Sequence, residues 1–267
     1  MADTVLHDLT DGLATITINR PEAMNAMNTE AKVALRDALR AAAEDTAVRA
    51  VLLTAAGDRA FCVGQDLKEH VGNLLSDREH GTTLTMHTVA DHYNPIVRAI
   101  TEMPKPVVAA VNGVAAGAGF GFALAADYRI VADTAAFNTS FAGVALTADS
   151  GVSWTLPRLI GASRASDLLL FPRNISAQEA YDLGIANRLV PSADLAGEAE
   201  SLARQLAAGP TMAYAAIKAS LAYGASHSLS DALEKEDALQ TLAGASEDHG
   251  IAVSAFLAKE RPKYLGR

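Results

Sequence analysis

The stretch Val107–Gly121, with the sequence Val-Val-Ala-Ala-Val-Asn-Gly-Val-Ala-Ala-Gly-Ala-Gly-Phe-Gly, decides how this chain can fold. It begins as a short β-branched run typical of a buried strand, and Asn112-Gly113 then marks a turn. Small residues follow and lead into Phe122–Asp127, which we expect to be helical. A strand that passes through small residues into a helix leaves backbone N–H groups free at the helix N-terminus. Such groups stabilise an anion, or an oxygen that becomes one during a reaction.

The composition predicts one large domain, or one domain with an appended helical piece. The chain has 267 residues, of which 50% are hydrophobic and 20% charged, as is usual for a globular protein. The formal net charge of -9 argues against nucleic-acid binding, because a phosphate backbone attracts a basic surface. It leaves room for a small polyanionic ligand held by a few lysines and arginines.

Two further features of the sequence limit where the protein works. No apolar run reaches the roughly 18 residues of a membrane span, and the first residues show no signal peptide. We therefore expect a cytoplasmic protein that does not enter a membrane. The single cysteine, Cys62, excludes an internal disulfide and offers no metal cluster; we expect it to be a small core residue.

Strand and helix patterns alternate through the first two thirds of the chain. The expected strands are Leu13–Asn19, Val48–Thr54, Val107–Val111, Tyr128–Ala132 and Ile185–Val190. A helix capped by Asn28 is expected to reach Ala43, and another to span Leu84–Met103. The stretch between Lys68 and Thr83 is polar and weakly periodic, so we expect a mobile segment that covers a ligand.

The last third of the chain reads as a series of helices. From Val152 the expected helices are Val152–Ile160, Ser163–Leu170, Ala177–Leu183, Leu195–Ala208, Thr211–Tyr223, Leu229–Leu242 and Glu247–Leu257. An alternating first part followed by helices predicts an α/β core with a C-terminal helical extension. Such an extension often serves as an assembly surface.

Four signatures in a fixed order carry a family resemblance. They are Asn19-Arg20-Pro21 with Asn25-Ala26-Met27, the run Ala60–Leu67 (Ala-Phe-Cys-Val-Gly-Gln-Asp-Leu), Pro104-Lys105-Pro106-Val107 continuing through Asn112-Gly113 to Gly117–Gly121, and Leu156-Pro157-Arg158 with Gly161. With these signatures the chain resembles the crotonase, or enoyl-CoA hydratase/isomerase, superfamily over nearly its whole length. Three stretches, Tyr93–Arg98, Asn112–Gly119 and Val253–Lys259, are similar to the branch of phenylacetate-pathway isomerases that act on 1,2-epoxyphenylacetyl-CoA.

The resemblance implies a fold, a substrate and an assembly. Residues 1–195 would form a spiral of ββα units that binds an acyl-CoA thioester, and residues 196–267 would form a helical region for assembly and active-site cover. The assembly would be a homotrimer or a dimer of trimers. Coenzyme A would enter as part of the substrate, with no tightly bound cofactor and no metal.

The resemblance also implies an oxyanion hole made of two backbone N–H groups. In this sequence they belong to Gln65, after the glycine of the Ala60–Leu67 run, and to Ala118, in the middle of the glycine turn. Charge develops on the thioester oxygen when a neighbouring proton is removed or a nucleophile adds to a conjugated double bond. One fixed donor at such an oxygen can contribute roughly 2.7–4 kcal/mol.

Other residues are assigned to substrate binding by position. The family pattern places Ala26, Val63, Gly64, Asp66, Leu67, Gly117 and Phe141 around the acyl-CoA, and the CoA phosphates could be held by Arg20, Lys68 and Lys263. For the three basic residues, ordinary solvated surface charge is an equally open interpretation. For Asp66, a cap at the start of a helix is favoured over a catalytic role.

The acid–base residues depart from the hydratase pattern. Enoyl-CoA hydratases carry two glutamates, and the matching positions here are Gly121 and Phe141, which cannot transfer a proton. A third family position holds a carboxylate, Asp149. In relatives it acts as a proton shuttle in isomerisation, or as the nucleophile of 4-chlorobenzoyl-CoA dehalogenase. Burial among Phe137, Phe141, Val144 and Leu146 would raise its pKa. The alternative is a helix cap before Val152.

Several functions and sites are weighed against this interpretation. The leading hypothesis is an acyl-CoA isomerase that uses Asp149, and the alternatives are an enoyl-CoA hydratase, a dehalogenase-like enzyme and a non-catalytic acyl-CoA-binding relative. A dinucleotide site is not favoured, because the run is G-x-G-x-G rather than G-x-G-x-x-G. His80, His87 and His92 do not have metal-ligand spacing, and their role stays open. Tyr93 is expected to be a core residue.

Overall fold

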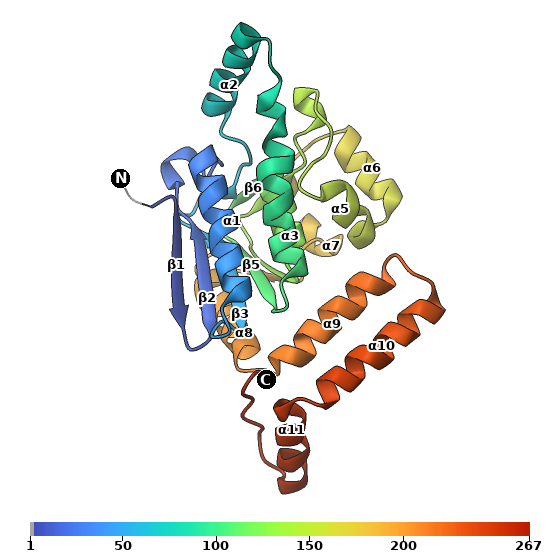
Figure 1. Cartoon of the computed structure of the whole chain (residues 1–267). Coiled ribbons are helices and arrows are strands. Elements are labelled where there is room, and N and C mark those ends of the chain that lie inside the picture. The colour runs from blue at the N-terminus through green and yellow to red at the C-terminus, as the bar shows by residue number, and fades with distance from the viewer. Residues whose placement is uncertain (1–2) are drawn as a thin grey trace.

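Two β-sheets form the centre of the molecule, and helices surround them (Figure 1). The computed structural model describes residues 3–267. The first sheet has the strand order β1 (Val5–Thr10), β2 (Leu13–Ile18), β3 (Ala50–Ala55), β5 (Val107–Val111), β7 (Tyr128–Ala132) and β10 (Arg188–Val190). The second has the order β4 (Ala60–Cys62), β6 (Val114–Ala116), β8 (Ala136–Asn138) and β9 (Ile175–Ser176).

The strands are arranged as a spiral of repeated ββα units. In each unit a strand of the first sheet is followed by a strand of the second sheet and then by a helix: β3, β4 and α2 (Leu67–His80), then β5, β6 and α4 (Ala118–Ala125), then β7, β8 and α5 (Val152–Ile160). The strands β3, β5 and β7 pair in parallel, as do β4, β6 and β8. The predicted fold class is therefore confirmed, and successive units place their strand-to-helix turns side by side.

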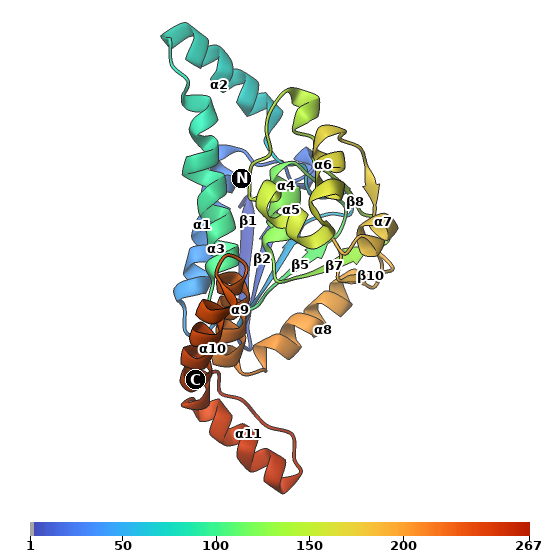
Figure 2. The same ribbon diagram turned by 90° about the vertical axis from the view of Figure 1, so that its right-hand side faces the viewer.

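Helices cover both faces of the first sheet. Helices α1 (Thr29–Glu44) and α3 (Asn94–Glu102) lie on one side and α8 (Leu195–Ala207) on the other, against β3, β5 and β7 (Figure 2). Helix α4 lies at the centre, and all eight of its residues are buried. The helices α6 (Ala162–Leu170) and α7 (Ala177–Asp182) follow α5 on the far side of the second sheet.

The C-terminal helices extend from one end of the core, opposite to α2 (Figures 1 and 2). They are α9 (Thr211–Gly224), α10 (Leu229–Gly244) and α11 (Glu247–Ala258). The Lys218 ammonium anchors α9 to the core by donating to the Ile100 carbonyl and to the Asp127 carboxylate, each at 2.8 Å. Within residues 3–267, no helix combines the length and the apolar character needed to cross a bilayer.

Several predicted elements match the structure closely. The strand β7 and the helix α5 have the predicted bounds, and Asn28 caps α1 by accepting from the Ala31 N–H. Every residue of β5 is buried, as expected for a strand covered on both faces. The alternating sequence of β2 produces the expected alternating burial along the middle of that strand.

The prediction of a mobile segment between Lys68 and Thr83 was wrong, because most of it is the helix α2. Specific caps hold this helix rather than an apolar face. At its start Asp66 accepts from the N–H groups of Lys68 and Glu69, and at its end Gly81 adopts the left-handed conformation. The Asp77 carboxylate then binds the chain that leaves the helix, accepting from the Thr85 N–H at 2.8 Å.

The single helix predicted over Leu84–Met103 is in fact three pieces. A 3-10 turn, η2 (Leu84–His87), and a π-helical turn, η3 (Val89–Tyr93), precede α3. Pro95 at the start of α3 has no N–H to donate to the preceding turn, so a regular α-helical ladder cannot run through it. The proline therefore accounts for the wider turn that ends at Tyr93.

Three short elements also differ from the prediction. The helix after the glycine turn begins at Ala118 rather than at Phe122, because its glycines lie inside the helix. The strand β1 was missed because it is an exposed edge strand without an apolar face. The two-residue strand β9 is too short to give a sequence signal.

The turns that follow β4 and β6 approach each other at backbone distance. A Cβ added at Gly119 would overlap the Cys62 carbonyl group, and one added at Gly113 would lie 2.5 Å from the Arg59 carbonyl carbon. Glycine at these positions lets two peptide backbones pack where no side chain fits. The glycines thus bring the ends of β4 and β6 together.

We predict that Gly119→Ala destabilises the protein while Gly72→Ala does not. The new methyl group of Gly119→Ala must displace the Cys62 backbone, an overpacking that costs about 1–3 kcal/mol. Gly72 lies on exposed α2 with nothing within 4 Å of its added Cβ, so alanine there should stabilise by up to about 1 kcal/mol. Urea unfolding of both variants checks this, and a Gly119→Ala protein as stable as the wild type would contradict the close approach.

Candidate active site

The first turn of the site connects β4 to α2. Its backbone is held by Met27, whose N–H donates to the Gly64 carbonyl at 2.7 Å and whose carbonyl accepts from the Asp66 N–H at 3.1 Å. These two bonds secure the peptides on either side of Gln65. They also place the neighbouring residue Ala26, which is buried, beside this turn.

The second turn connects β6 to α4 and lies directly against the first. The Gly64 Cα is so near that an added Cβ would lie 3.2 Å from the Ala118 nitrogen. Gly64 has a φ of +86°, and Gly117, which precedes the helix, has a φ of +53°. Both glycines therefore allow a backbone with positive φ, and Gly64 also provides space for the close approach.

Two backbone N–H groups at these turns have no acceptor among residues 3–267. They belong to Gln65 and to Ala118, the two residues predicted to form the oxyanion hole. Ala118 is the first residue of α4, so its N–H lies at the positive end of that helix. Two unpaired donors beside one another can bind an oxygen that gains negative charge.

A third turn brings Asp149 to the same place. Ser150 packs against α4 so closely that a Cβ on Gly121 would lie 2.5 Å from the Ser150 Cβ and 2.6 Å from its carbonyl oxygen. Gly121 is one helical turn after Ala118, so the Asp149–Ser150 turn lies next to the start of α4. The position where hydratases carry a glutamate is thus filled by the backbone of the turn that carries Asp149.

The environment of Asp149 favours its protonated form. Burial raises the pKa of its carboxyl group, and the Ser150 hydroxyl, which donates to it at 2.8 Å, only partly offsets this effect. No lysine or arginine among the described residues forms an ion pair with it. A carboxyl group with a raised pKa is a stronger base when it is ionised than an ordinary carboxylate.

The alternative role of Asp149 as a helix cap is not what the structure shows. The residue at the N-cap of α5 is Gly151, and no side chain caps that helix. Only the Asp149 backbone carbonyl takes part, accepting from the Val152 N–H at 3.0 Å. The carboxylate is therefore free of the helix N-terminus.

The apolar surroundings expected for Asp149 are present only in part. Phe137 and Phe141 are buried, whereas Val144 and Leu146 are exposed, with relative exposures of 62% and 41%. The segment after Phe141 forms a short 3-10 turn, η4 (Ala142–Val144), that turns these two side chains outward. Phe141, at the second hydratase-acid position, is a buried apolar residue.

Cys62 is buried at the end of β4, as expected for a core residue. Burial raises the pKa of its thiol to about 12, and the Gly64 N–H, which points at the sulfur at 3.4 Å, only slightly offsets this. A thiol with this pKa stays protonated at neutral pH. Cys62 is therefore not a nucleophile of the site.

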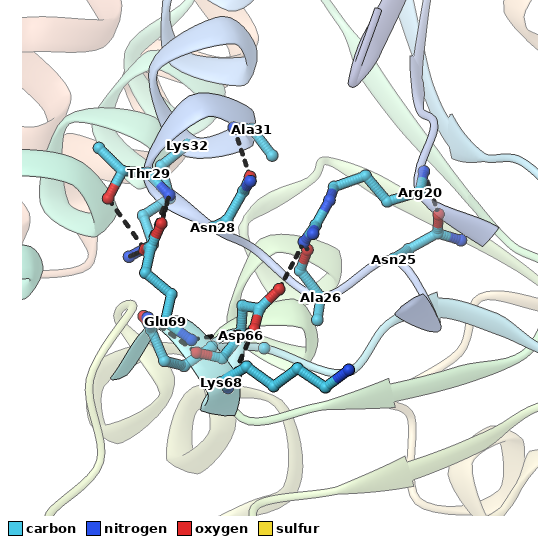
Figure 3. Close-up of polar contacts among 12 residues, drawn as sticks. Arg20, Asn25, Ala26, Asn28, Thr29, Ala31, Lys32, Asp66, Lys68 and Glu69 are labelled. Atoms are coloured by element: carbon cyan, nitrogen blue, oxygen red, sulfur yellow. Dashed lines mark hydrogen bonds and ion pairs between the residues drawn. The ribbon is translucent and has the colours of Figure 1, made fainter. Parts of the chain in front are cut away.

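Charged residues beside the first turn are paired with one another (Figure 3). Arg20 donates to the Asp66 carboxylate at 2.9 Å and also to the Ala26 carbonyl. Glu69 accepts from the N–H of Thr29 at 2.9 Å and from its hydroxyl at 2.9 Å, which ties α2 to the start of α1. Asp66 is thus a helix cap and ion-pair partner, as favoured from the sequence.

The predicted phosphate-binding cations do not form one group in this chain. Arg20 is occupied by Asp66, while the Lys68 side chain is exposed and extends away from that pair (Figure 3). Lys263 is also exposed, but its neighbour Tyr264 packs near Arg49, which precedes β3, at the other end of the strands. Within one chain, Lys68 is the cation best placed beside the first turn.

The remaining predicted contact residues and the histidines are placed as follows. Val63 is half-buried and Leu67 is exposed at the start of α2. His80 and His87 are exposed. His92 is half-buried, and its pKa is lowered by burial and by the nearby charge of Lys32. The structure does not assemble the three histidines into one site.

Tyr93 takes part in the site in a way that the sequence did not reveal. It was expected to be a core residue, and it is 2% exposed. Its hydroxyl nevertheless donates to the Gln65 side-chain oxygen. The signal in the sequence is weak, because 28 residues separate the two and the contact depends on the π-helical turn η3.

We predict that Asp149→Asn stabilises the folded protein at about pH 8, and that the gain shrinks as the pH falls to about 4. The pKa of Asp149 is higher in the folded protein than its unfolded value of 3.8, so ionisation of this carboxyl group opposes folding. The wild type therefore has its full stability below pH 3.8 and loses part of it as the pH rises through the folded-state pKa. Urea unfolding across this range measures the difference between the variant and the wild type.

Asp66→Asn provides the matched control with the opposite sign. Burial alone would raise the pKa of Asp66, but Arg20 and the N–H groups of α2 outweigh it and lower the pKa. Its stabilisation is therefore present above the unfolded pKa and is lost on acidification. An Asp149→Asn protein that is less stable than the wild type at about pH 8 would contradict the environment described for that residue.

Comparisons with known proteins agree with this arrangement. The family model of enoyl-CoA hydratases/isomerases matches residues 8–267. The chain is 39% identical to 1,2-epoxyphenylacetyl-CoA isomerase of Escherichia coli over 100% of both chains. It is 41% identical to a probable enoyl-CoA hydratase of Rhodobacter capsulatus over 99% of this chain and 98% of that one. A solved structure from Mycobacterium abscessus, described as an enoyl-CoA hydratase/isomerase, superimposes with a TM-score of 0.93 at 46% identity, covering 98% of this chain and 100% of the other. The chain belongs to the enoyl-CoA hydratase/isomerase family, whose members act on CoA thioesters.

Proposed function

We propose that this protein is an acyl-CoA isomerase that shifts a double bond of an enoyl-CoA through an enolate, with Asp149 as the proton shuttle. The observation that carries the proposal is the pairing of two free N–H groups with a single buried carboxyl group. Gln65 and Ala118 supply the donors, and Asp149 supplies the base.

The structure of the start of α4 favours isomerisation over hydration. Adding water needs a positioned water and a separate acid for the α-carbon, and hydratases use two glutamates for this. Here Gly121 leaves no room for a side chain, because Ser150 occupies that space, and Phe141 is apolar. Moving one proton between two carbons needs only one carboxylate.

The proposed reaction conserves atoms and charge at each step. The Asp149 carboxylate removes a proton from C2 of a 3-enoyl thioester, and the electron pair moves onto the thioester oxygen, where the two N–H groups stabilise the dienolate. The protonated Asp149 then returns the proton to C4, and the double bond lies between C2 and C3. No cofactor other than the CoA moiety of the substrate is required.

Two finer alternatives within the family have support of their own. The likeness to the 1,2-epoxyphenylacetyl-CoA isomerase of Escherichia coli favours rearrangement of a ring epoxide, and the aromatic walls Phe137 and Phe141 would suit such an acyl group. The likeness to a probable enoyl-CoA hydratase keeps hydration as the second candidate. A dehalogenase-like enzyme would instead form an aspartyl adduct at Asp149, which mass spectrometry detects.

We expect the wild type to convert 3-hexenoyl-CoA to 2-hexenoyl-CoA and the Asp149→Asn variant to lose about 10²–10⁴-fold in kcat, because the shuttle base is gone. The wild-type rate should also fall as the pH drops below the pKa of Asp149, since the base must be ionised. Absorbance of the conjugated product follows the reaction, and deuterium incorporation at C2 and C4 reports the proton transfers.

The controls separate isomerisation from hydration. Asp167→Asn, an exposed change on α6, should keep wild-type activity. Formation of 3-hydroxyacyl-CoA from crotonyl-CoA is measured in parallel by chromatography. Efficient hydration that persists in the Asp149→Asn protein would overturn the assignment.

We further propose that the C-terminal helices form the surface of a trimer, or of a dimer of trimers. The proposal is supported by a cluster of exposed apolar side chains on these helices. Large exposed apolar patches are rare on monomeric proteins and usually mark an interaction surface. These side chains are Ile217, Leu221, Leu229, Leu233, Leu242, Val253, Phe256 and Leu257. The net charge of -9 makes association with nucleic acid an unlikely use of this surface.

The test of assembly is the mass in solution. Light scattering on a sizing column should give three or six chains for the wild type, and a Leu221→Glu/Phe256→Glu variant should dissociate because it buries charge in an apolar contact. A Leu84→Glu control places the same charge on η2, outside these helices. A monomeric wild type would refute the assembly.

A further inference from the structure

The Tyr93 side chain touches both turns that carry the free N–H groups. Its hydroxyl donates to the Gln65 side-chain oxygen in the first turn. Its ring packs edge-on against Phe122 of α4, with ring centroids 5.9 Å apart at an interplanar angle of 62°. Phe122 lies one helical turn after Ala118, so one buried residue joins the two halves of the site.

The ring of Tyr93 is itself held from several sides. The Lys32 ammonium lies 5.3 Å from the ring centroid, and that ammonium is oriented by the Thr88 hydroxyl at 2.8 Å. Tyr93 is also the last residue of the π-helical turn η3 and leads directly into α3. A side chain fixed by packing, by a cation and by its backbone can hold a partner in one geometry.

The phenol remains a hydrogen-bond donor throughout the working range of pH. Burial raises its pKa, and the nearby carboxylates of Asp149 and Glu69 raise it further. The hydroxyl therefore keeps its proton. Because the Gln65 side-chain oxygen accepts a hydrogen bond from this hydroxyl, the side chain of Gln65 is held on the Tyr93 side of its turn.

The remaining freedom of the first turn lies at Gln65 itself. Met27 secures the peptides before and after it, but no backbone bond restrains the Gln65 N–H among residues 3–267. The N–H shares one planar peptide with the Gly64 carbonyl, which among these residues only the Met27 N–H holds, so a rotation of this peptide would change the direction of the N–H. The bond from Tyr93 to the Gln65 side chain opposes the rotation.

We propose that Tyr93 is a positioning residue, which fixes Gln65 from its side chain and so aims the Gln65 N–H at the point where the Ala118 N–H also converges. The inference rests on the proposed use of these N–H groups as the oxyanion hole, but it does not depend on which acyl group is bound. Tyr93 acts through Gln65, and it exchanges no proton with the substrate.

The test begins with Tyr93→Phe, which removes the hydroxyl and keeps the ring on Phe122. With 3-hexenoyl-CoA, we expect kcat to fall about 10- to 100-fold, because a misdirected donor is most costly in the transition state. KM should change by less than about threefold, and the pH profile should keep its shape, since no titrating group is lost. Tyr181→Phe on exposed α7 is the control for the same chemical change.

A second variant tests the connection to Gln65. Gln65→Met removes the acceptor at similar size and should reproduce the loss in kcat. The double variant Tyr93→Phe/Gln65→Met should be no slower than either single variant, because both break the same contact. Losses that multiply in the double variant would overturn the proposal, as would a loss of one limb of the pH profile, which would indicate proton transfer by Tyr93.

An infrared measurement tests the aim of the N–H without any turnover. The probe is hexanoyl-CoA with a ¹³C-labelled thioester carbonyl, whose stretching frequency should fall when the wild type binds it. Tyr93→Phe should bind the probe with a smaller fall, and Tyr181→Phe with the full one. A wild-type shift retained in Tyr93→Phe would refute the positioning role. If wild type shifts the carbonyl but does not isomerise 3-hexenoyl-CoA, the isomerase assignment fails while the role of Tyr93 stands.

Discussion

The whole site depends on the contact between two backbones, where the turn after β6 packs on the end of β4. At Gly119 the approach leaves no space for a single methyl group beside the Cys62 carbonyl. This contact sets the distance between the Gln65 and Ala118 N–H groups, since each belongs to one of the two turns. The spiral of ββα units makes it possible, because parallel pairing of β4 with β6 aligns their carboxyl ends. The proposed oxyanion hole thus follows from strand pairing and from the absence of side chains, rather than from a particular functional group.

The same close packing decides which acid the site can use. The Asp149–Ser150 turn lies against Gly121, and Ser150 adopts a φ of 50° in order to do so. A non-glycine residue in this conformation costs of order 1 kcal/mol, which the packing around it must supply. A glutamate on α4 and this turn cannot occupy the same space. The loss of the hydratase acid and the arrival of Asp149 are therefore two consequences of one steric arrangement.

The features that could be predicted from the sequence are those that a few consecutive residues determine. The buried strand β5, the cap at Asn28 and the glycine turn each occupy a few consecutive residues, and their structures agree with the pattern. Helix α2 escaped prediction because its stability comes from caps at Asp66 and Gly81 rather than from an apolar stripe. Tyr93 was assigned to the core, correctly for its ring, yet its hydroxyl meets Gln65 only after η3 widens the turn before Pro95. A contact that depends on an irregular turn and on a residue far away in the sequence produces no periodic pattern of apolar residues.

The charged residues around the first turn pair with one another and leave Asp149 without an ion-pair partner within residues 3–267. Arg20 is paired with Asp66, and the buried Lys32 ammonium lies 3.9 Å from Glu69, which is itself bound to Thr29. Arg20 and Lys32 thus face carboxylates that hold α1 and α2 together, whereas Lys68 is exposed. Asp149 forms no ion pair with either paired cation, and its carboxylate accepts from the Ser150 hydroxyl. A carboxylate that had taken one of these cations would have a lowered pKa and would be a weaker base. The ion pairs that stabilise α2 therefore leave Asp149 without a cation in the described part of the chain, and burial raises the pKa of its carboxyl group.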